Sequence, residues 1–339
     1  MSAPRRRDAG NRPFRTQQEF DLSMSDSQPL DGVAARASVP GRSSLARTRT
    51  WARERSQFIT LMLIPPIVLL VGLIAMPFVI GLGLSFTDYM LSNPPARFNG
   101  FGNYLEMFKS GEFWAALRLT MLFTVIAVAV QTALGVALAV LLHEETRHVP
   151  LLRMLYLLPM AVTPVAATFT FRMMFNPSLG VLNYLLALFG LPPQDWLGNG
   201  TMALVSLILV DTWQHTPFIL LIVGGGLASL PAEPFEAAKI DGATAWQTFT
   251  RITLPLLKPF LAIAILFRSI DAFKTFDIIF VLTAGGPGTS TTTLNVYAYK
   301  QAIEFVSLGY GAAVAIVMML IVTIAALVFL RRSRLMTVA

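Results

Sequence analysis

Ionisable side chains interrupt two apolar stretches of the sequence. One stretch carries four of them at steps of three, with alternating sign: Arg268, Asp271, Lys274 and Asp277. The other carries Asp211, closely followed by Trp213 and Gln214. Charges in apolar surroundings are costly and by default mark functional sites. Residues three apart can also pair along one helix, so two interpretations stay open: a hydrated path for a polar solute, and ion pairs that hold helices together.

Other kinds of chemistry find no support in the sequence. The chain has no cysteine and only three histidines, none of which is spaced to share a metal ion with a second ligand. No Ser/His/Asp arrangement forms a credible catalytic site. The glycine-rich stretch that starts at Gly285 lacks the Gly-Lys-Ser/Thr ending of a phosphate-binding loop. We therefore expect no catalytic residue, no metal, no cofactor and no nucleic-acid partner, and the chain is not expected to be an enzyme.

The composition indicates a polytopic membrane protein with an all-α fold. Of the 339 residues, 55% are hydrophobic and 13% are charged, whereas soluble domains carry about 25% charged residues. Six apolar runs are long enough to cross a hydrocarbon core of about 30 Å, at residues 58–86, 115–142, 151–175, 202–230, 256–282 and 310–330. We expect six transmembrane helices within residues 57–334. Residues 1–56 are predicted to be a disordered basic arm, and residues 335–339 a short tail.

The distribution of Lys and Arg predicts the orientation of these spans. Eleven arginines precede Phe58, and a basic cluster follows the last span: Arg331, Arg332 and Arg334. Because Lys and Arg concentrate in cytoplasmic loops, we expect both termini inside. The loop 233–255, which carries Lys239 and Arg251, then faces the cytoplasm.

Helix contacts are also suggested by the positions of small residues and prolines. Small residues form two rows on the second predicted span, one of Ala129, Ala133 and Ala137 and one of Gly135 and Ala139. Such rows let helices approach closely, so we expect this face to pack on another helix. Prolines at 159 and 164 are expected to break the third span.

The polar segment 233–255 separates two apolar runs and is predicted to fold as a helix–turn–helix. Pro234 suits a first helical turn, and Glu233 suits the positive end of a helix. Asp241-Gly242 supplies a turn in which glycine takes a positive φ. A second short helix is expected over residues 243–251, with Leu254-Pro255 as its end. The hairpin is either a plain link between two spans or a surface that docks in a partner's groove.

A sequence motif in this segment favours docking. Glu236-Ala-Ala-Lys-Ile-Asp-Gly-Ala243, followed by Phe249-Thr-Arg-Ile-Thr-Leu-Pro255, resembles the EAA loop of binding-protein-dependent ABC importer permeases. In that family the loop is a coupling helix that enters a cleft of the ATP-hydrolysing subunit. The resemblance implies this role for Glu236, Ala237, Ala238, Asp241, Gly242, Ile252, Leu254 and Pro255.

Further motifs resemble the sugar-importing branch of that family, which includes maltose and glycerol-3-phosphate permeases. They are Asp211-Thr-Trp-Gln, residues 267–277 and Leu282-Thr-Ala-Gly-Gly-Pro-Gly, in which Ala284 replaces an expected glycine. The resemblance covers roughly residues 58–334. It implies a type I importer subunit of the bacterial inner membrane that moves a sugar or polyol inward. Implied partners are an ATPase dimer, a second homologous permease chain and a periplasmic or lipid-anchored solute-binding protein.

For a sugar, the carboxylates and amides in the spans would bond hydroxyl groups, and Trp213 would cover the apolar face of a ring. The alternative from another functional class is a self-sufficient, ion-coupled carrier that uses the charges of the fifth span for coupling. Such carriers often show internal repeats, and the two halves of this sequence show no convincing repeat.

Overall fold

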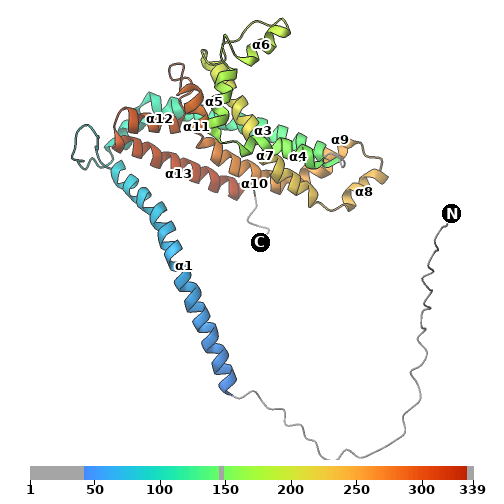
Figure 1. The fold of residues 1–339 in the computed structure, drawn as a ribbon, viewed down its shortest axis with the longest axis horizontal. Helices are drawn as coiled ribbons and strands as arrows, with labels where there is room; N and C mark the ends of the chain where they lie inside the picture. The colour runs from blue at the N-terminus through green and yellow to red at the C-terminus, as the bar shows by residue number, and fades with distance from the viewer. Residues whose placement is uncertain (1–41, 145–148, 334–339) are drawn as a thin grey trace, which may run out of the picture. The chain divides into compact units, whose positions relative to one another are not determined.

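The computed structural model describes residues 42–144 and 149–333, where the regular elements are helices (Figure 1). The α-helices are α1 (Arg42–Ser85), α2 (Gly102–Lys109), α3 (Gly111–Glu144), α4 (Val149–Ala161), α5 (Pro164–Met174), α6 (Val181–Leu188), α7 (Gly200–Ala228), α8 (Glu233–Ile240), α9 (Ala245–Thr248), α10 (Leu254–Phe273), α11 (Asp277–Thr283), α12 (Leu294–Tyr299) and α13 (Leu308–Arg332). Two π-helical turns, η1 (Phe249–Thr253) and η2 (Lys300–Glu304), continue α9 and α12.

Five helical stretches of the described residues are long and apolar enough to cross a membrane, and the bent pair α4–α5 makes up to six. This agrees with the all-α, multi-span fold expected from the sequence. The chain divides into two compact units, Met1–Val68 and Leu69–Ala339. Helix α1 already begins at Arg42, whereas the sequence predicts no secondary structure up to residue 56; residues 1–41 lie outside the described part.

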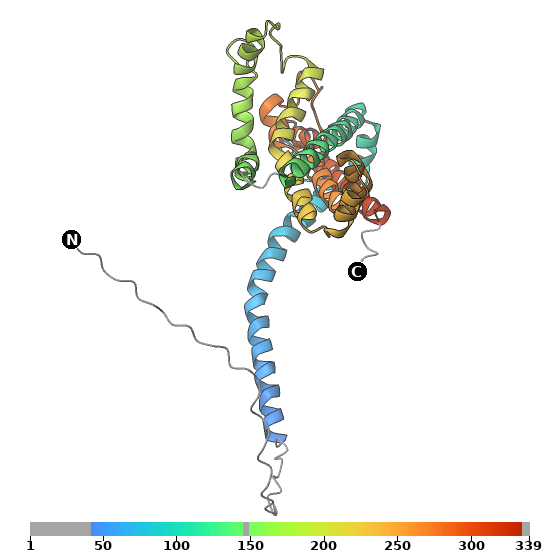
Figure 2. The same cartoon turned by 90° about the vertical axis from the view of Figure 1, so that its right-hand side faces the viewer.

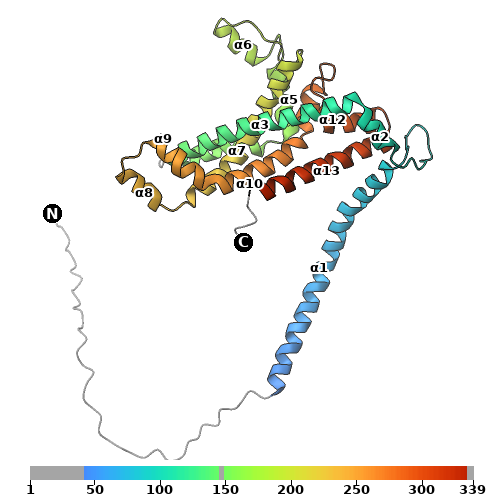
Figure 3. The same cartoon turned by 180° about the vertical axis from the view of Figure 1, so that it is seen from behind.

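Helices α3, α7 and α10 run side by side and form the centre of the second unit (Figures 1 and 3). Gly135 of α3 lies directly against α7, since a Cβ there would come within 2.6 Å of the Ile219 side chain. Ala139, one turn later, is 2% exposed. The predicted small-residue contact is therefore confirmed for this row, whereas the row of Ala129, Ala133 and Ala137 is exposed.

The third predicted span is sharply bent. Helices α4 and α5 meet at 98°; Figure 2 gives a second view of this green segment. Pro164 starts α5 and pushes the preceding residue, Thr163, into an extended conformation with ψ 137°, because proline disfavours the helical region for the residue before it. Pro159, by contrast, stays inside α4, so only one of the two expected proline breaks forms.

The fifth predicted span is also interrupted. Helix α10 ends at Phe273, and α11 starts only at Asp277. Lys274 is the first residue after α10, and its carbonyl accepts a hydrogen bond of 2.6 Å from Asn295 Nδ2. The expected continuous span over residues 256–282 is therefore two helices, and the break separates the charges that the sequence places on one stripe.

The segment between α5 and α7 is held by one buried side chain. Asn183 of α6 donates from Nδ2 to the carbonyls of Pro177 and Gln194, at 3.0 Å each. Its Oδ1 accepts from Trp196 Nε1 at 2.9 Å and from the Gln194 amide at 3.1 Å. This exposed segment, which has no Lys or Arg between residues 176 and 200, is thus an ordered surface element.

Candidate functional site

A buried ion pair joins the three central helices. Asp211 of α7 is 0% exposed and Arg268 of α10 is 1% exposed. Arg268 donates from Nη2 to Asp211 Oδ2 and from Nε to Gln131 Oε1 of α3, the latter at 2.7 Å. Gln131 in turn donates from Nε2 to Asp211 Oδ2 at 2.7 Å. Dehydrating each ion costs several kcal/mol, which the partners of the pair offset in part. Asp211 Oδ2 accepts two hydrogen bonds, whereas Asp211 Oδ1 is buried without one.

The charges continue from this buried pair to a more accessible carboxylate. Arg268 Nη1 lies 3.0 Å from Asp271 Oδ2, and the Asp271 side chain is 59% exposed. His215 of α7 bridges the two carboxylates, with Nδ1 at 3.1 Å from Asp211 Oδ1 and Nε2 at 3.7 Å from Asp271 Oδ2. Pairing of residues three apart along the helix is therefore found for Arg268 and Asp271, whereas Asp277 lies beyond the helix break.

A cavity of about 470 Å³ lies beside this chain of charges, with its polar wall formed by Gln214, His215, Arg268, Asp271 and Lys274. Gln214 is 3% exposed and donates from Nε2 to the carbonyl of Val162, at the bend between α4 and α5, over 2.9 Å. Its Oε1 is buried without a hydrogen-bond partner in the protein. The cavity wall therefore offers cationic donors and the accessible carboxylate of Asp271 as an acceptor, which suits a solute rich in hydroxyl groups.

The structure brings four of the seven predicted pathway residues to this wall, namely Gln214, Arg268, Asp271 and Lys274. Asp211 lies behind them in the ion pair. Trp213 does not line the cavity, because its ring packs edge-on against Phe171 with centroids 5.2 Å apart. Asp277 lies beyond the break, at the start of α11, and does not line the cavity either.

Two residues of the site were not among the predicted ones, Gln131 and His215. A signal for Gln131 was available, because an amide within an otherwise apolar span must find partners. His215 follows Gln214 directly, but its position between two carboxylates depends on the packing of α7 against α10. That packing is not encoded in local sequence spacing.

The segment 233–255 begins as predicted, with a helix and a glycine turn. Gly242, at φ +71°, donates to the Lys239 carbonyl at 3.2 Å, and Ala243 donates to the Ala238 carbonyl at 2.9 Å. These two bonds form a Schellman ending for α8. Thr244 and Gln247 then exchange side-chain and backbone hydrogen bonds in a capping box that starts α9.

The second helix of this segment differs from the expectation. It does not end before Leu254: α9 passes through η1 into α10, which gives one helical stretch from Ala245 to Phe273. The capping box fixes its start at Ala245 rather than at residue 243. The polar loop is therefore joined to the helix of Arg268 and Asp271 without a break.

The predicted coupling residues lie in different surroundings. Ala237, Ala238, Asp241, Gly242 and Ile252 line one open cleft of about 520 Å³ between α8 and the α9–η1 segment. Ala238 is 6% exposed, which places the helix backbone close to this cleft. Outside it lie exposed Glu236, Leu254 on the α3 side and exposed Pro255.

Comparison with protein families assigns residues 151–334 to the binding-protein-dependent transport system inner membrane components. A probable ABC transporter permease protein, y4oQ of Sinorhizobium fredii, is 41% identical over 74% of this chain and 82% of its own length. The trehalose/maltose transport system permease protein MalF of Thermococcus litoralis is 35% identical over 81% of this chain and 92% of its own length. The sulfoquinovosyl glycerol transport system permease protein SmoG of Agrobacterium fabrum is 35% identical over 86% and 95%.

Among solved structures, a chain of a bacterial alginate ABC transporter, in complex with a pentasaccharide-bound periplasmic protein, has the same fold. It superposes with a TM-score of 0.74 at 24% identity, over 86% of this chain and 99% of that one. The residues that match the family, 151–334, include the EAA-like loop, the ion pair of Asp211 and Arg268, and the cavity wall. The chain therefore belongs to the family of binding-protein-dependent transport system inner membrane components.

Proposed function

We propose that this chain is the permease subunit of an ABC importer that moves a sugar, polyol or related carbohydrate into the cell. The observation that carries the proposal is the single helical stretch Ala245–Phe273. At one end it forms part of the small-residue cleft at Ala238, and near the other it bears Arg268 and Asp271 on the cavity wall. A movement imposed on the cytoplasmic loop is thereby transmitted to the cavity.

The chemistry of the cavity supports a carbohydrate as the solute. Asp271, whose side chain is 59% exposed, accepts hydrogen bonds, and Lys274 donates them. Relatives named for trehalose/maltose and for sulfoquinovosyl glycerol transport point to the same class of solute. We assign the contacts with solute to Gln214, Asp271 and Lys274, and assign Asp211 and Arg268 to holding the wall in place.

The proposed function requires partners. We propose that an ATPase dimer supplies the energy through the loop 233–255, that a second permease chain completes the path, and that a solute-binding protein delivers the carbohydrate from outside. Both termini would lie in the cytoplasm of a bacterium whose inner membrane holds the complex. The alginate transporter, solved with its periplasmic protein, offers a model for such an assembly.

Proteoliposomes with the chain, its co-expressed second permease and its ATPase provide the test. With ATP inside and binding protein outside, labelled trehalose or maltose should accumulate. Asp271→Asn should reduce this uptake at least several-fold, whereas Asp277→Asn, the same change at an exposed carboxylate away from the cavity wall, should leave it nearly unchanged.

One result would contradict the importer assignment, and a second would contradict the solute contact assigned to Asp271. The first is uptake by the purified chain alone, driven by a proton or sodium gradient. This is the behaviour of the ion-coupled carrier, which the family membership does not support. The second is equal uptake by the two Asp→Asn variants, which would remove Asp271 from the solute path while leaving the importer assignment intact.

A further inference from the structure

Helix α2 lies at the end of the bundle away from α8 and α9 (Figure 3) and presents an exposed apolar face. Phe101, Leu105 and Phe108 form this face, at the spacing that keeps side chains on one side of a helix. Each of the three is exposed by between 49% and 68%. Glu106 and Lys109, the charged residues of the helix, are exposed on its flank. The helix is therefore amphipathic on its exposed side alone.

The opposite side of α2 is fastened to the bundle, so the apolar face cannot turn inward. Asn103 donates from Nδ2 to the carbonyls of Ser85 and Thr87, at 2.9 Å and 2.7 Å. Met107 is fully buried and belongs to the same apolar cluster as Tyr310 of α13. Helix α2 thus connects the end of α1 to the start of α13, with its apolar face held outward.

The packing against α13 indicates the depth of α2 in the membrane. Residues 308–330 of α13 carry no charge. At 1.5 Å per residue they span about 35 Å, slightly more than a hydrocarbon core of about 30 Å. Tyr310, in the cluster of Met107, lies near the start of this run. Helix α2 is therefore level with the boundary between the hydrocarbon core and the lipid headgroups, where amphipathic helices bind a membrane surface.

The apolar face of α2 continues onto α3. Trp114 donates from Nε1 to the carbonyl of Phe108 at 2.9 Å, and the two rings have centroids 6.2 Å apart. Trp114 is itself exposed, as is Met121, which lies seven residues later on the same side of α3. Tryptophan is enriched where a membrane protein passes from lipid to water. The exposed surface of α2 is thus continuous with an apolar surface that enters the span.

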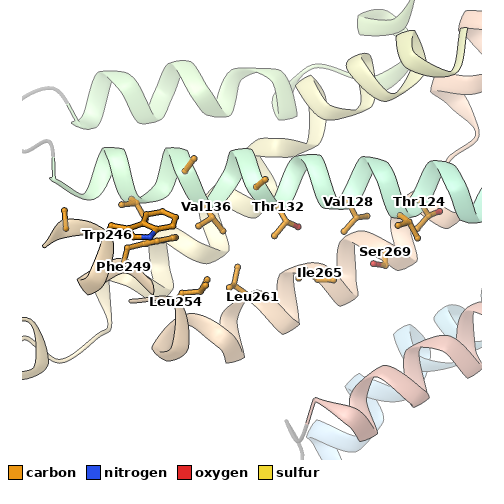
Figure 4. Close-up of a pocket in the computed structure, with 16 residues that line it drawn as sticks. Thr124, Val128, Thr132, Val136, Trp246, Phe249, Leu254, Leu261, Ile265 and Ser269 are labelled. Carbon is orange, nitrogen blue, oxygen red and sulfur yellow. The ribbon is translucent and has the colours of Figure 1, made fainter. Parts of the chain in front are cut away.

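This surface is separate from the hollow of about 970 Å³ that lies between α3 and α10 (Figure 4). The α3 wall of that hollow begins at Thr124, and no residue of α2 lines it. A segment that fills the hollow therefore does not cover Leu105 or Phe108. The face of α2 needs an apolar neighbour of its own, because exposed apolar surface next to water is unfavourable.

We propose that α2 binds the lipid surface as an interfacial helix, with Phe101, Leu105 and Phe108 among the upper acyl chains and Glu106 in water. Lys109, on the flank, can extend its stem over the apolar face and place its ammonium group at a lipid phosphate. The helix then fixes the depth of the adjoining ends of α1 and α13. This inference depends on the membrane embedding that the chain shares with its family, and not on the proposed solute.

Spin labelling tests the lipid contact, because the chain has no cysteine and a single introduced one gives a unique site. Leu105→Cys places a nitroxide on the apolar face, and its neighbour Glu106→Cys places one on the charged flank. The assembled complex is studied in nanodiscs of phosphatidylcholine and phosphatidylglycerol, with oxygen as the lipid-soluble relaxant and a nickel chelate as the water-soluble one. We expect the ratio of oxygen to nickel accessibility to be several-fold higher at position 105 than at position 106. Phe108→Cys is a second probe of the same face and should agree with Leu105→Cys.

Two results would overturn the inference. Equal ratios at positions 105 and 106 would show that the face is in water. Low accessibility to both relaxants at positions 105 and 108 would show that protein covers it, and repeating the measurement without binding protein would tell whether that protein is the cover. Neither result bears on the proposed function, because the labels report on α2 whether or not solute is transported. Conversely, failure of ATP-driven uptake would leave the accessibility ratios as a valid test of the lipid contact.

Discussion

Replacing Arg268 by methionine tests whether the ion pair holds the three central helices together. Arg268 donates to Asp211, Gln131 and Asp271. Methionine is long, flexible and apolar, so it fills much of the same space. What remains is a carboxylate at Asp211 that is 0% exposed and has lost its cation.

The expected cost follows from what Asp211 retains. Removing one partner of a buried ion pair destabilises a protein by about 3–5 kcal/mol. Gln131 still donates to Asp211 at 2.7 Å, and His215 remains at 3.1 Å, so we expect the lower end, about 3 kcal/mol. At roughly 2 °C per kcal/mol for a chain of this size, the midpoint of thermal unfolding should fall by about 6 °C. The assay is tryptophan fluorescence of the complex in detergent or nanodiscs.

Two further variants make the prediction specific. Arg268→Met combined with Asp211→Leu removes both charges and should regain more than half of the lost stability, because apolar replacements of both partners are often neutral. Asp271→Asn should cost at most about 1 kcal/mol, since exposed pairs contribute little, and the Asp271 side chain is 59% exposed. A melting temperature for Arg268→Met unchanged within error, or a double variant no more stable than the single one, would refute the reasoning.

Three further predictions concern other parts of the chain. Gly242→Pro should abolish ATP-driven uptake without preventing membrane insertion, measured by transport and by membrane fractionation, because proline cannot adopt φ +71° or donate the N–H that ends α8; wild-type uptake would make the loop a plain linker. Gly135→Leu should destabilise the protein by about 1–3 kcal/mol in a thermal melt through overpacking against Ile219, whereas Val130→Leu, at an exposed site of the same helix, should not. Asn183→Ala should accelerate hydrogen exchange of the segment between α5 and α7 with little change in melting temperature, because four hydrogen bonds of that segment depend on this side chain.

The charged residues of the site were predictable from the sequence. Which of them is buried and which lines the cavity was not. Arg268 and Asp271 stand out as ions in an apolar run, and both take part in the site. That Asp211 is buried behind the wall while Asp271 lines the cavity depends on how α7 faces α10. Spacing along one helix does not contain this information.

The helix breaks, too, could be predicted from the sequence only in part. Pro164 predicts a helix break, because proline disfavours the helical region for the residue before it. The angle of 98° between α4 and α5 could not be predicted in this way, because it depends on tertiary packing. The break after Phe273 has neither a proline nor a glycine that would predict it. The Lys274 carbonyl at this break accepts a hydrogen bond from Asn295, which lies 21 residues further on. Periodicity likewise placed small residues on two rows of α3 without indicating that only the row of Gly135 faces α7.

The continuity of α9, η1 and α10 has a mechanical consequence for the whole site. From Ala245 to Arg268 the helical stretch is roughly 35 Å long at 1.5 Å per residue, and Arg268 is tied to α7 and α3 through Asp211 and Gln131. A displacement of the end at Ala245 should therefore carry α10, α7 and α3 together. Gln214 moves with them, while its acceptor, the Val162 carbonyl, lies at the bend between α4 and α5.

That hydrogen bond is thus where we expect the cavity wall to part when the loop moves. Gln214→Leu removes this hydrogen bond and should raise ATP hydrolysis in the absence of binding protein while lowering solute uptake. Gln214→Glu keeps the size of the side chain but loses the donor to Val162, so it should raise basal hydrolysis to a similar extent. Basal hydrolysis unchanged in both variants would show that the wall does not open at this contact.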